Sequence, residues 1–384
     1  MSTATQMIRP GAAGQDAYLA RVLSSESEIS ELADVGQALL TKFGSASQPK
    51  FFLASLSKPW GPRVVSVSQN GRLLGIVYAK ERRVAGFPTG TVYIDATAGS
   101  MVVAEPAMRK EVFRVAISNL FRQPGVRALR LLIAPNGKER SVIEDLRAST
   151  SADLAFTRAK HHCSLPLPRS YDALLASLGP HSRRNFRYYR RRFEAEGHRY
   201  VAQIGIDDFR RAAHELLQHQ VIGAREDGIN RSLAMLAATE RPLLTGLRGQ
   251  DGKWLSILGG WYEGDTAIVL FQMNDDKHHP KSSLSVVMRG YATETLIMKG
   301  VRSIIFWGGV GEPLNQIALE LPALGVYLDK RGPAWRVFRG IVSALRPRTP
   351  ADQRRVGLRS KLTYHADWIV PRRTDQVEIG WSSG

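Results

Sequence analysis

The stretch Ser170–Arg199 reads SYDALLASLGPHSRRNFRYYRRRFEAEGHR, and the interpretation of the whole chain starts from it. A short amphipathic segment ends at Gly179-Pro180, because both residues interrupt a helix. An arginine-rich helix follows, in which Phe186 and Phe193 are seven residues apart and therefore share one helical face. This spacing predicts a long helix with a buried aromatic stripe.

Both ends of this helix carry sequence signals. Ser182 is a predicted N-cap, because its hydroxyl can accept a free backbone N–H, and Gly197 suits the C-terminal stop. Tyr189 is expected to face inward beside the two phenylalanines. The basic residues either form a solvated face or line a substrate site. Three of them are the candidates for substrate binding: Arg184, Arg187 and Arg191.

The motifs in and around this stretch resemble the BioF2-like (CelD/BcsL-type) acyltransferases of the GNAT superfamily, which are related to the FemAB aminoacyl transferases. The matching residues are Leu165–Pro168, Tyr171-Asp172, Ser177-Leu178, Arg183-Arg184, Arg190–Arg192 and Glu196-Gly197. The resemblance implies an α/β chain of the α+β type with two tandem GNAT-like domains. Each domain would hold a mixed, mostly antiparallel sheet flanked by helices.

Patterns along the chain agree with two similar halves, each ordered as helix, antiparallel strands, helix and strand. We expect an N-terminal GNAT-like domain at 1–158, a C-terminal acyltransferase domain at 159–342 and a basic tail at 343–384. Asn70-Gly71 predicts a hairpin turn, because this pair tolerates positive φ. Other expected elements are helices 29–43, 106–121, 283–298 and 315–321, and strands 128–134, 243–247, 255–262, 267–273, 303–307 and 325–328.

The composition, above all the net charge, indicates a class of binding partner but does not identify a single one. The chain has 384 residues, 43% of them hydrophobic, and a net charge of +18. Such a charge attracts phosphate-bearing partners, which are a nucleotide cofactor, RNA such as tRNA, or an anionic membrane surface touched peripherally. One cysteine, Cys163, excludes an intrachain disulfide and agrees with a reducing compartment. Because no signal peptide or spanning stretch is evident, we expect a cytoplasmic protein; the sequence indicates no oligomeric state.

The resemblance implies a donor site at the junction of strand 267–273 and helix 283–298, with acetyl-CoA or another acyl-CoA as co-substrate. Pyrophosphate is commonly held by backbone N–H groups at a helix N-terminus. Lysine and serine residues surround this junction, although serines stand where the family has glycines. The expected cofactor-binding residues are Phe271, Met273, Lys281, Ser282, Ser283 and Ser285.

The resemblance points to His219 and Arg225 as catalytic residues on the acceptor side, and Glu226 and Asp227 are chemical alternatives as general base. Trp307 is expected to contact substrate, because Phe306-Trp307 resembles the end of a family strand. The family's Asp and its following Tyr-Lys are not evident here. We expect no metal, because adjacent histidines on a strand point to opposite faces and no Cys or carboxylate spacing completes a zinc set.

Three hypotheses about function remain open. The first is an N-acyltransferase that moves an acyl group from an acyl-CoA or carrier thioester to an amine on a small molecule or peptide. The second is a FemAB-like transferase that depends on aminoacyl-tRNA, with the arginine helix and tail holding the RNA. The third is a catalytically degenerate module that binds an anionic surface or partner.

Overall fold

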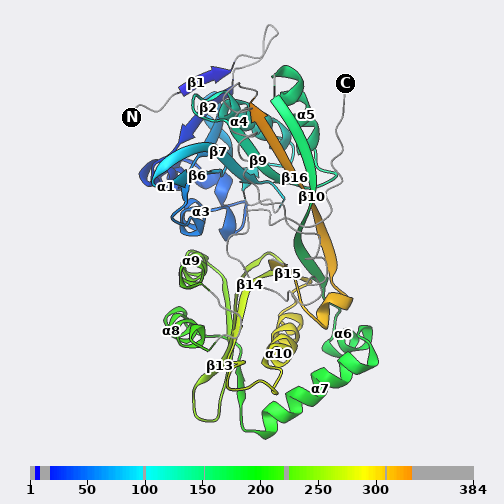
Figure 1. Cartoon of the computed structure of the whole chain (residues 1–384). Helices are drawn as coiled ribbons and strands as arrows, with labels where there is room; N and C mark the ends of the chain where they lie inside the picture. The colour runs from blue at the N-terminus through cyan, green and yellow to red at the C-terminus, as the bar shows by residue number, and fades with distance from the viewer. Residues whose placement is uncertain are drawn as a thin grey trace, which may run out of the picture.

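The computed structural model describes residues 5–8, 18–97, 101–150, 152–219, 225–307 and 309–330. The chain forms two lobes, which two long strands join (Figure 1). The basic tail expected at 343–384 lies outside the described residues. Within the described part, no helix has both the length and the apolar character needed to cross a membrane.

The first lobe is built mainly from the N-terminal half of the chain. Its elements in order are β1 (Thr5–Ile8), β2 (Tyr18–Leu23), α1 (Glu26–Val35), α2 (Gln37–Leu40), η1 (Ser45–Ser47), α3 (Pro49–Ser55), β3 (Trp60–Pro62), β4 (Val64–Gln69), β5 (Arg72–Val77), β6 (Lys80–Val84), β7 (Phe87–Asp95), β8 (Val102–Ala104), α4 (Arg109–Arg122), β9 (Ala128–Ile133) and α5 (Glu139–Ser149). Strands β1, β2, β4, β5 and β8 form one sheet in that order.

The rest of the described chain forms the second lobe and the link between the lobes. Its elements are β10 (Ala152–Pro166), α6 (Tyr171–Ser177), α7 (Pro180–Ala195), β11 (Arg199–Val201), α8 (Ile206–Leu217), α9 (Glu226–Ala237), β12 (Pro242–Arg248), β13 (Trp254–Glu263), β14 (Thr266–Asn274), α10 (Leu284–Met298), β15 (Ser303–Trp307), η2 (Leu314–Gln316) and β16 (Leu319–Lys330). Helices α8 and α9 cover one face of the second-lobe sheet, and α10 covers the other (Figure 1).

An 11-stranded sheet runs through both lobes in the order β11-β12-β13-β14-β15-β10-β16-β9-β7-β6-β3. Two neighbouring pairs in it are parallel, β7 with β9 in the first lobe and β14 with β15 in the second. The other described pairs are antiparallel. Each lobe therefore has a mostly antiparallel sheet with a single parallel pair, which confirms the expected fold class.

The arginine-rich helix lies where its aromatic spacing predicts. Phe186 and Phe193 are each 3% exposed, and Tyr189 packs against the same hydrophobic cluster, which α7 shares with α10. Because full burial of such an apolar side chain contributes roughly 1.5–3 kcal/mol, this stripe stabilises the packing of α7 against α10. Gly197 follows the helix with φ of +71°, as expected for the stop.

Two local predictions were wrong. Helix α7 begins at Pro180 rather than at Ser182, because proline at the first helical position needs no N–H partner; Ser182 is buried in the first turn. The helix expected at 315–321 is only a short 3₁₀ turn, η2. From Leu319 onward the chain is drawn into β16 instead, because it pairs with β10 over its whole length.

The expected domain boundary between residues 158 and 159 falls inside β10. Strand β16 pairs with β10 on one side and with β9 on the other. Its residues Val326 and Leu328 are buried in the core of the first lobe. The last strand of the described chain thus completes the hydrophobic core of the first lobe, which the N-terminal half forms.

Candidate functional site

The second lobe contains an open strand edge at the centre of its sheet. Strand β14 pairs with β15 only from Thr266 to Val269, where the partner residue is Phe306. Beyond this point β14 continues to Asn274, and among the described residues its pairing partner there is β13 alone. We call the stretch Leu270–Asn274 the open edge. An edge of this kind presents unpaired backbone N–H and C=O groups, to which an extended ligand can add.

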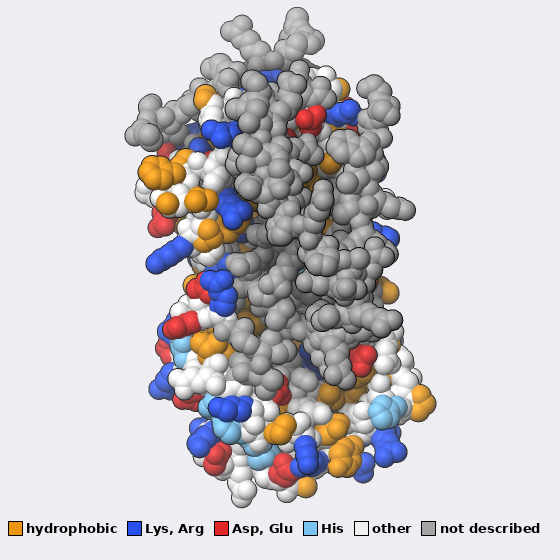
Figure 2. Space-filling model, viewed as in Figure 1, with side chains coloured by type: hydrophobic (Ala, Val, Ile, Leu, Met, Phe, Trp, Pro, Cys, Tyr) orange, Lys and Arg blue, Asp and Glu red, His pale blue; other side chains and the backbone are white. Residues whose placement is uncertain are grey.

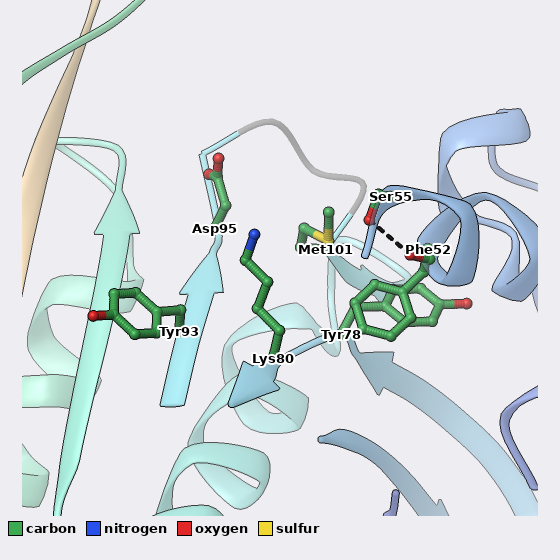
Figure 3. A pocket seen from close by; sticks show the side chains of 7 residues that line it. All are labelled: Phe52, Ser55, Tyr78, Lys80, Tyr93, Asp95 and Met101. Atoms are coloured by element: carbon green, nitrogen blue, oxygen red, sulfur yellow. Dashed lines mark hydrogen bonds between the residues drawn. The ribbon is translucent and has the colours of Figure 1, made fainter. Parts of the chain in front are cut away.

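The matching parallel pair in the first lobe is closed. Strand β7 pairs with β9 up to Asp95, and the amide of Ala96 donates a further hydrogen bond of 2.8 Å to the carbonyl of Leu132. A hollow lies near the end of β7, but it has a volume of only about 10 Å³, roughly that of one water. Figure 3 shows Lys80 pointing into it toward Asp95. Among the described residues, this hollow is therefore too small for an extended ligand.

Arg289 of α10 crosses the space beside the open edge. The Arg289 side chain is 8% exposed, and its Nε donates to Gln272 Oε1 of the open edge at 3.2 Å. Its Nη1 lies 3.4 Å from the carbonyl oxygens of Gly311 and Glu312, which follow β15. A buried guanidinium thus ties β14 to the segment after β15, and it places a positive charge next to the open edge. An arginine among apolar residues of a predicted helix is the signal that could have identified it.

Aromatic rings enclose the point where β14 and β15 part. Trp307 ends β15, is 7% exposed, and stacks on His162 of β10 with ring centroids 5.6 Å apart. Trp261 meets Trp307 edge-on at 5.0 Å, and Phe51 of the first lobe meets Trp261 at 5.1 Å. The expected substrate residue Trp307 therefore lies at the start of the open edge, with a buried histidine against it.

The loop between β14 and α10 presents a helix N-terminus. Ser283 is the N-cap but has left-handed backbone angles, with φ of +45°, and its side chain makes no capping hydrogen bond. The N–H groups of the first turn therefore have no side-chain cap. Lys281 is exposed, and Ser282, Ser283 and Ser285 are half-buried. A helix start without a side-chain cap leaves backbone N–H groups from which an anion can accept hydrogen bonds.

The side chains of Phe271 and Met273 are not available to a ligand. They are 5% and 2% exposed and pack in the cluster beneath α8, where Phe271 meets Phe209 with ring centroids 5.9 Å apart. Only the backbone of these two residues can take part in binding at the open edge.

The expected catalytic residues lie at some distance from the open end of the β14–β15 pair. His219 follows α8, and its Nδ1 is 3.5 Å from Oδ2 of Asp275, just beyond β14. Asp275 is six residues past Val269, which corresponds to roughly 20 Å of strand. Arg225 makes its ion pair with Asp227 at 3.0 Å, and Glu226 is exposed at the first turn of α9. Within the described residues, no hydrogen bond or ion pair joins these two side chains to His219.

The arginine-rich helix lies on the far side of α10 from the sheet (Figure 1). Arg184, Arg187 and Arg191 are exposed. A hollow of about 230 Å³ lies between α6, α7 and α10. Burial raises the pKa of Tyr171, which lines the hollow, to about 12, so its phenol is neutral at physiological pH.

On the described part of the viewed face, basic side chains are spread over both lobes (Figure 2). The overall charge of +18 therefore does not by itself mark a binding surface on the described part of that face. The local features at the open edge and on α7 are therefore better guides to a binding site than the overall net charge.

Comparison with known proteins identifies the fold. No protein-family model matches the sequence, and no curated protein does. FemX matches the structure with a TM-score of 0.53 at 11% identity, covering 76% of this chain and 93% of FemX. The C-terminal domain (DUF2156) of a protein described as a lysylphosphatidylglycerol synthetase from Agrobacterium fabrum matches with a TM-score of 0.52 at 14% identity, over 83% of this chain and 96% of that domain. A protein of unknown function from Bacteroides thetaiotaomicron matches with a TM-score of 0.52 at 14% identity, over 80% of this chain and all of that one.

Proposed function

We propose that the chain is an acyltransferase of the GNAT type, which moves an acyl group from a thioester donor to an amine acceptor. The observation that carries this proposal is the open edge at Leu270–Asn274, beside a parallel pair that separates after four residues. Its counterpart in the first lobe is closed, so the second lobe is the transferase lobe. The shared fold with FemX and the Agrobacterium fabrum domain supports the same class of reaction.

The donor is an acyl-CoA or a carrier-bound thioester. Its extended arm adds to the backbone of the open edge, and its phosphates lie at the start of α10, near Lys281 and Ser283. The acceptor amine attacks the thioester carbonyl and loses a proton to a base, the C–S bond breaks, and the thiolate departs and is protonated. The enzyme then needs mainly to align the two reactants and to take up that proton.

We assign the proton-accepting role to His162 in place of His219. The thioester lies where β14 and β15 separate, next to Trp307, and His162 stacks on that ring. His219 is at the other end of the open edge, close to where the phosphates of the donor would lie. The acceptor is a small-molecule or peptide amine, and the name of the Agrobacterium fabrum protein adds phosphatidylglycerol to the acceptors worth testing.

A charge reversal at the start of α10 tests the donor site. Lys281→Glu is expected to weaken binding of acetyl-CoA or a long-chain acyl-CoA several-fold, because it places a negative charge beside the phosphates. Lys299→Glu is the matched control, since it makes the same change at the other end of α10. Calorimetric titration at low salt measures both. Equal affinities for the two variants would remove the start of α10 from the donor site.

A second candidate function uses aminoacyl-tRNA as the donor. The observation in its favour is the solvent-facing arginine surface of α7, with Tyr188 half exposed beside it. Arginine and tyrosine together bind single-stranded RNA through phosphates and stacking. A plot of the logarithm of the tRNA binding constant against the logarithm of the salt concentration has a negative slope. The variant Arg184/Arg187/Arg191→Gln should then make this slope less steep by roughly 0.7 for each phosphate that α7 no longer neutralises.

The same measurements separate the three hypotheses. Thermal shift with acetyl-CoA, a long-chain acyl-CoA and bulk tRNA at two salt concentrations shows which donor the chain binds. If tRNA binding keeps its salt dependence in the triple variant, α7 does not hold RNA. If no donor binds in any of these experiments, the transferase proposal fails and a module that binds other anions remains.

A further inference from the structure

Three side chains with metal-binding chemistry converge at the end of β14. They are His219 after α8, Asp275 after β14, and His278 in the loop that leads to α10. We call them the His–Asp–His cluster. Their ligand atoms all lie within 4.8 Å of one another. The sequence alone does not reveal this arrangement, because 55 residues lie between His219 and Asp275 and no spacing motif joins them.

The distances within the cluster suit one small ion. His278 Nδ1 lies 2.9 Å and 3.0 Å from the two carboxylate oxygens of Asp275, and His219 Nδ1 lies 3.5 Å from Oδ2. A tetrahedral zinc site has bonds of about 2.0–2.1 Å, which separates its ligand atoms by roughly 3.3 Å. The three side chains therefore need only small adjustments to bind one ion between them.

The surroundings favour a transition metal with an open coordination position. The Asp275 side chain is 10% exposed, whereas those of His219 and His278 are 35% and 54% exposed. A buried carboxylate thus anchors the cluster, while the imidazoles leave room for an ion to enter and for a water as fourth ligand. Two imidazoles and one carboxylate suit Zn²⁺, Co²⁺ or Ni²⁺ and do not suit Mg²⁺ or Ca²⁺, which require mostly oxygen ligands.

The same contacts also fit a simpler arrangement, in which each imidazole donates its Nδ1–H to Asp275. The two arrangements need opposite tautomers, since an ion takes the Nδ1 lone pair and leaves the proton on Nε2. We propose that His219, Asp275 and His278 form a binding site for a divalent transition-metal ion of the Zn²⁺ class. This site lies roughly 20 Å of strand away from the point of acyl transfer, and the proposal does not depend on the proposed function.

Metal titration of the full, tag-free chain tests the proposal. After treatment with a chelator, the protein is titrated with Co²⁺, whose visible spectrum reports tetrahedral coordination, and with Zn²⁺ in competition with a chromophoric chelator. We expect one ion per chain, bound in the micromolar range or tighter. Asp275→Asn and His278→Gln should each weaken Zn²⁺ binding at least tenfold. His279→Ala should not, because His279 is the adjacent histidine but lies outside the cluster.

Circular dichroism melts show whether each variant is folded, and His278→Gln keeps the test decisive if Asp275→Asn is unstable, because His278 is more than half exposed. Absence of Zn²⁺ binding by the wild-type chain overturns the proposal. So does an equal loss of affinity in His279→Ala, or unchanged affinity in His278→Gln. Because no acyl donor is present in these titrations, none of the outcomes decides whether the chain is an acyltransferase.

Discussion

His162 is the residue on which the proposed chemistry most depends. It is 7% exposed and stacks on Trp307 at the point where β14 and β15 separate. Loss of a general base commonly lowers turnover by roughly 10²–10⁴-fold. We expect His162→Ala to reduce the turnover number of acyl transfer by roughly a hundredfold, with donor affinity unchanged, because the donor binds backbone and the start of α10.

Steady-state kinetics with the donor identified by binding, together with calorimetric titration, separate these two effects. His279→Ala is the control, since it alters a histidine that is neither the proposed base nor a member of the His–Asp–His cluster. His219→Ala belongs in the same series, because it tests the assignment made from the sequence. A full loss of turnover in His219→Ala with normal turnover in His162→Ala would reverse our assignment of the base.

Gly260 illustrates how a single missing side chain sets the path of a strand. It lies at an irregularity in the pairing of β13 with β14, and a Cβ added there would collide with the carbonyl oxygen of Ile268. At the neighbouring Gly259, a Cβ would meet only the side-chain atoms of Leu236, Phe209 and Phe271, which can shift. We therefore expect Gly260→Ala to lower the free energy of unfolding by roughly 2 kcal/mol or more, and Gly259→Ala by less. Chemical denaturation measures both, and the opposite order would contradict this account of the bulge.

Among the secondary-structure elements, α7 owes its attachment to α10 partly to one arginine. Arg190 donates to Glu294 of α10 at 2.6 Å and lies over the ring of Tyr291 at 4.2 Å. Both charged side chains are less than one-third exposed. Arg192, two residues on, forms its ion pair with Glu196 of its own helix end and is more exposed.

This difference predicts different costs for two identical substitutions. Arg190→Gln should lower the free energy of unfolding by roughly 1–2 kcal/mol, because it leaves Glu294 half-buried without its partner. Arg192→Gln should leave it almost unchanged, as exposed pairs contribute little. Thermal and urea denaturation at low and high salt measure the two values. If Arg190→Gln costs no more stability than Arg192→Gln, the pair of Arg190 with Glu294 does not stabilise the contact between α7 and α10.

Much of the whole molecule follows from local sequence patterns. The predicted strand 303–307 coincides with β15, and the predicted helix 283–298 differs from α10 by one residue. Asn70 and Gly71 have positive φ in the turn between β4 and β5, as their pair predicts. The predictions of these elements are correct because neighbouring residues determine their periodicity, caps and turns.

The two strands that join the lobes, β10 and β16, could not be predicted from local sequence patterns. β10 has a side-chain pattern without strict alternation, and the sequence analysis placed a domain boundary inside it. Only four residues of the 12-residue β16 were expected to be a strand. Their pairing partners lie far away in sequence, so no local pattern reports them. The His–Asp–His cluster and Arg289 were missed for the same reason, since the fold alone brings their partners together.

The shared strands predict that the first lobe cannot fold from the N-terminal half alone. In the sheet β16 lies between β10 and β9, and a fragment of residues 1–158 would lack it. The fragment would lose Val326 and Leu328 from its core and expose two strand edges, which favours aggregation. We expect residues 1–158 to be insoluble, or to lack a cooperative unfolding transition.

The register of β10 and β16 shows how the missing strand can be restored to this fragment. Arg158 lies opposite Leu324 in the antiparallel pair, so an Asn-Gly turn can join them and restore the last seven residues of β16 beside both neighbours. We expect residues 1–158, Asn-Gly and residues 324–330 in one chain to be soluble and to unfold cooperatively by circular dichroism. A matched chain with Val326→Asp and Leu328→Asp controls for added length and should fail, because it buries charge in the core. If residues 1–158 unfold cooperatively without this addition, the first lobe is an independent domain and β16 only covers its edge.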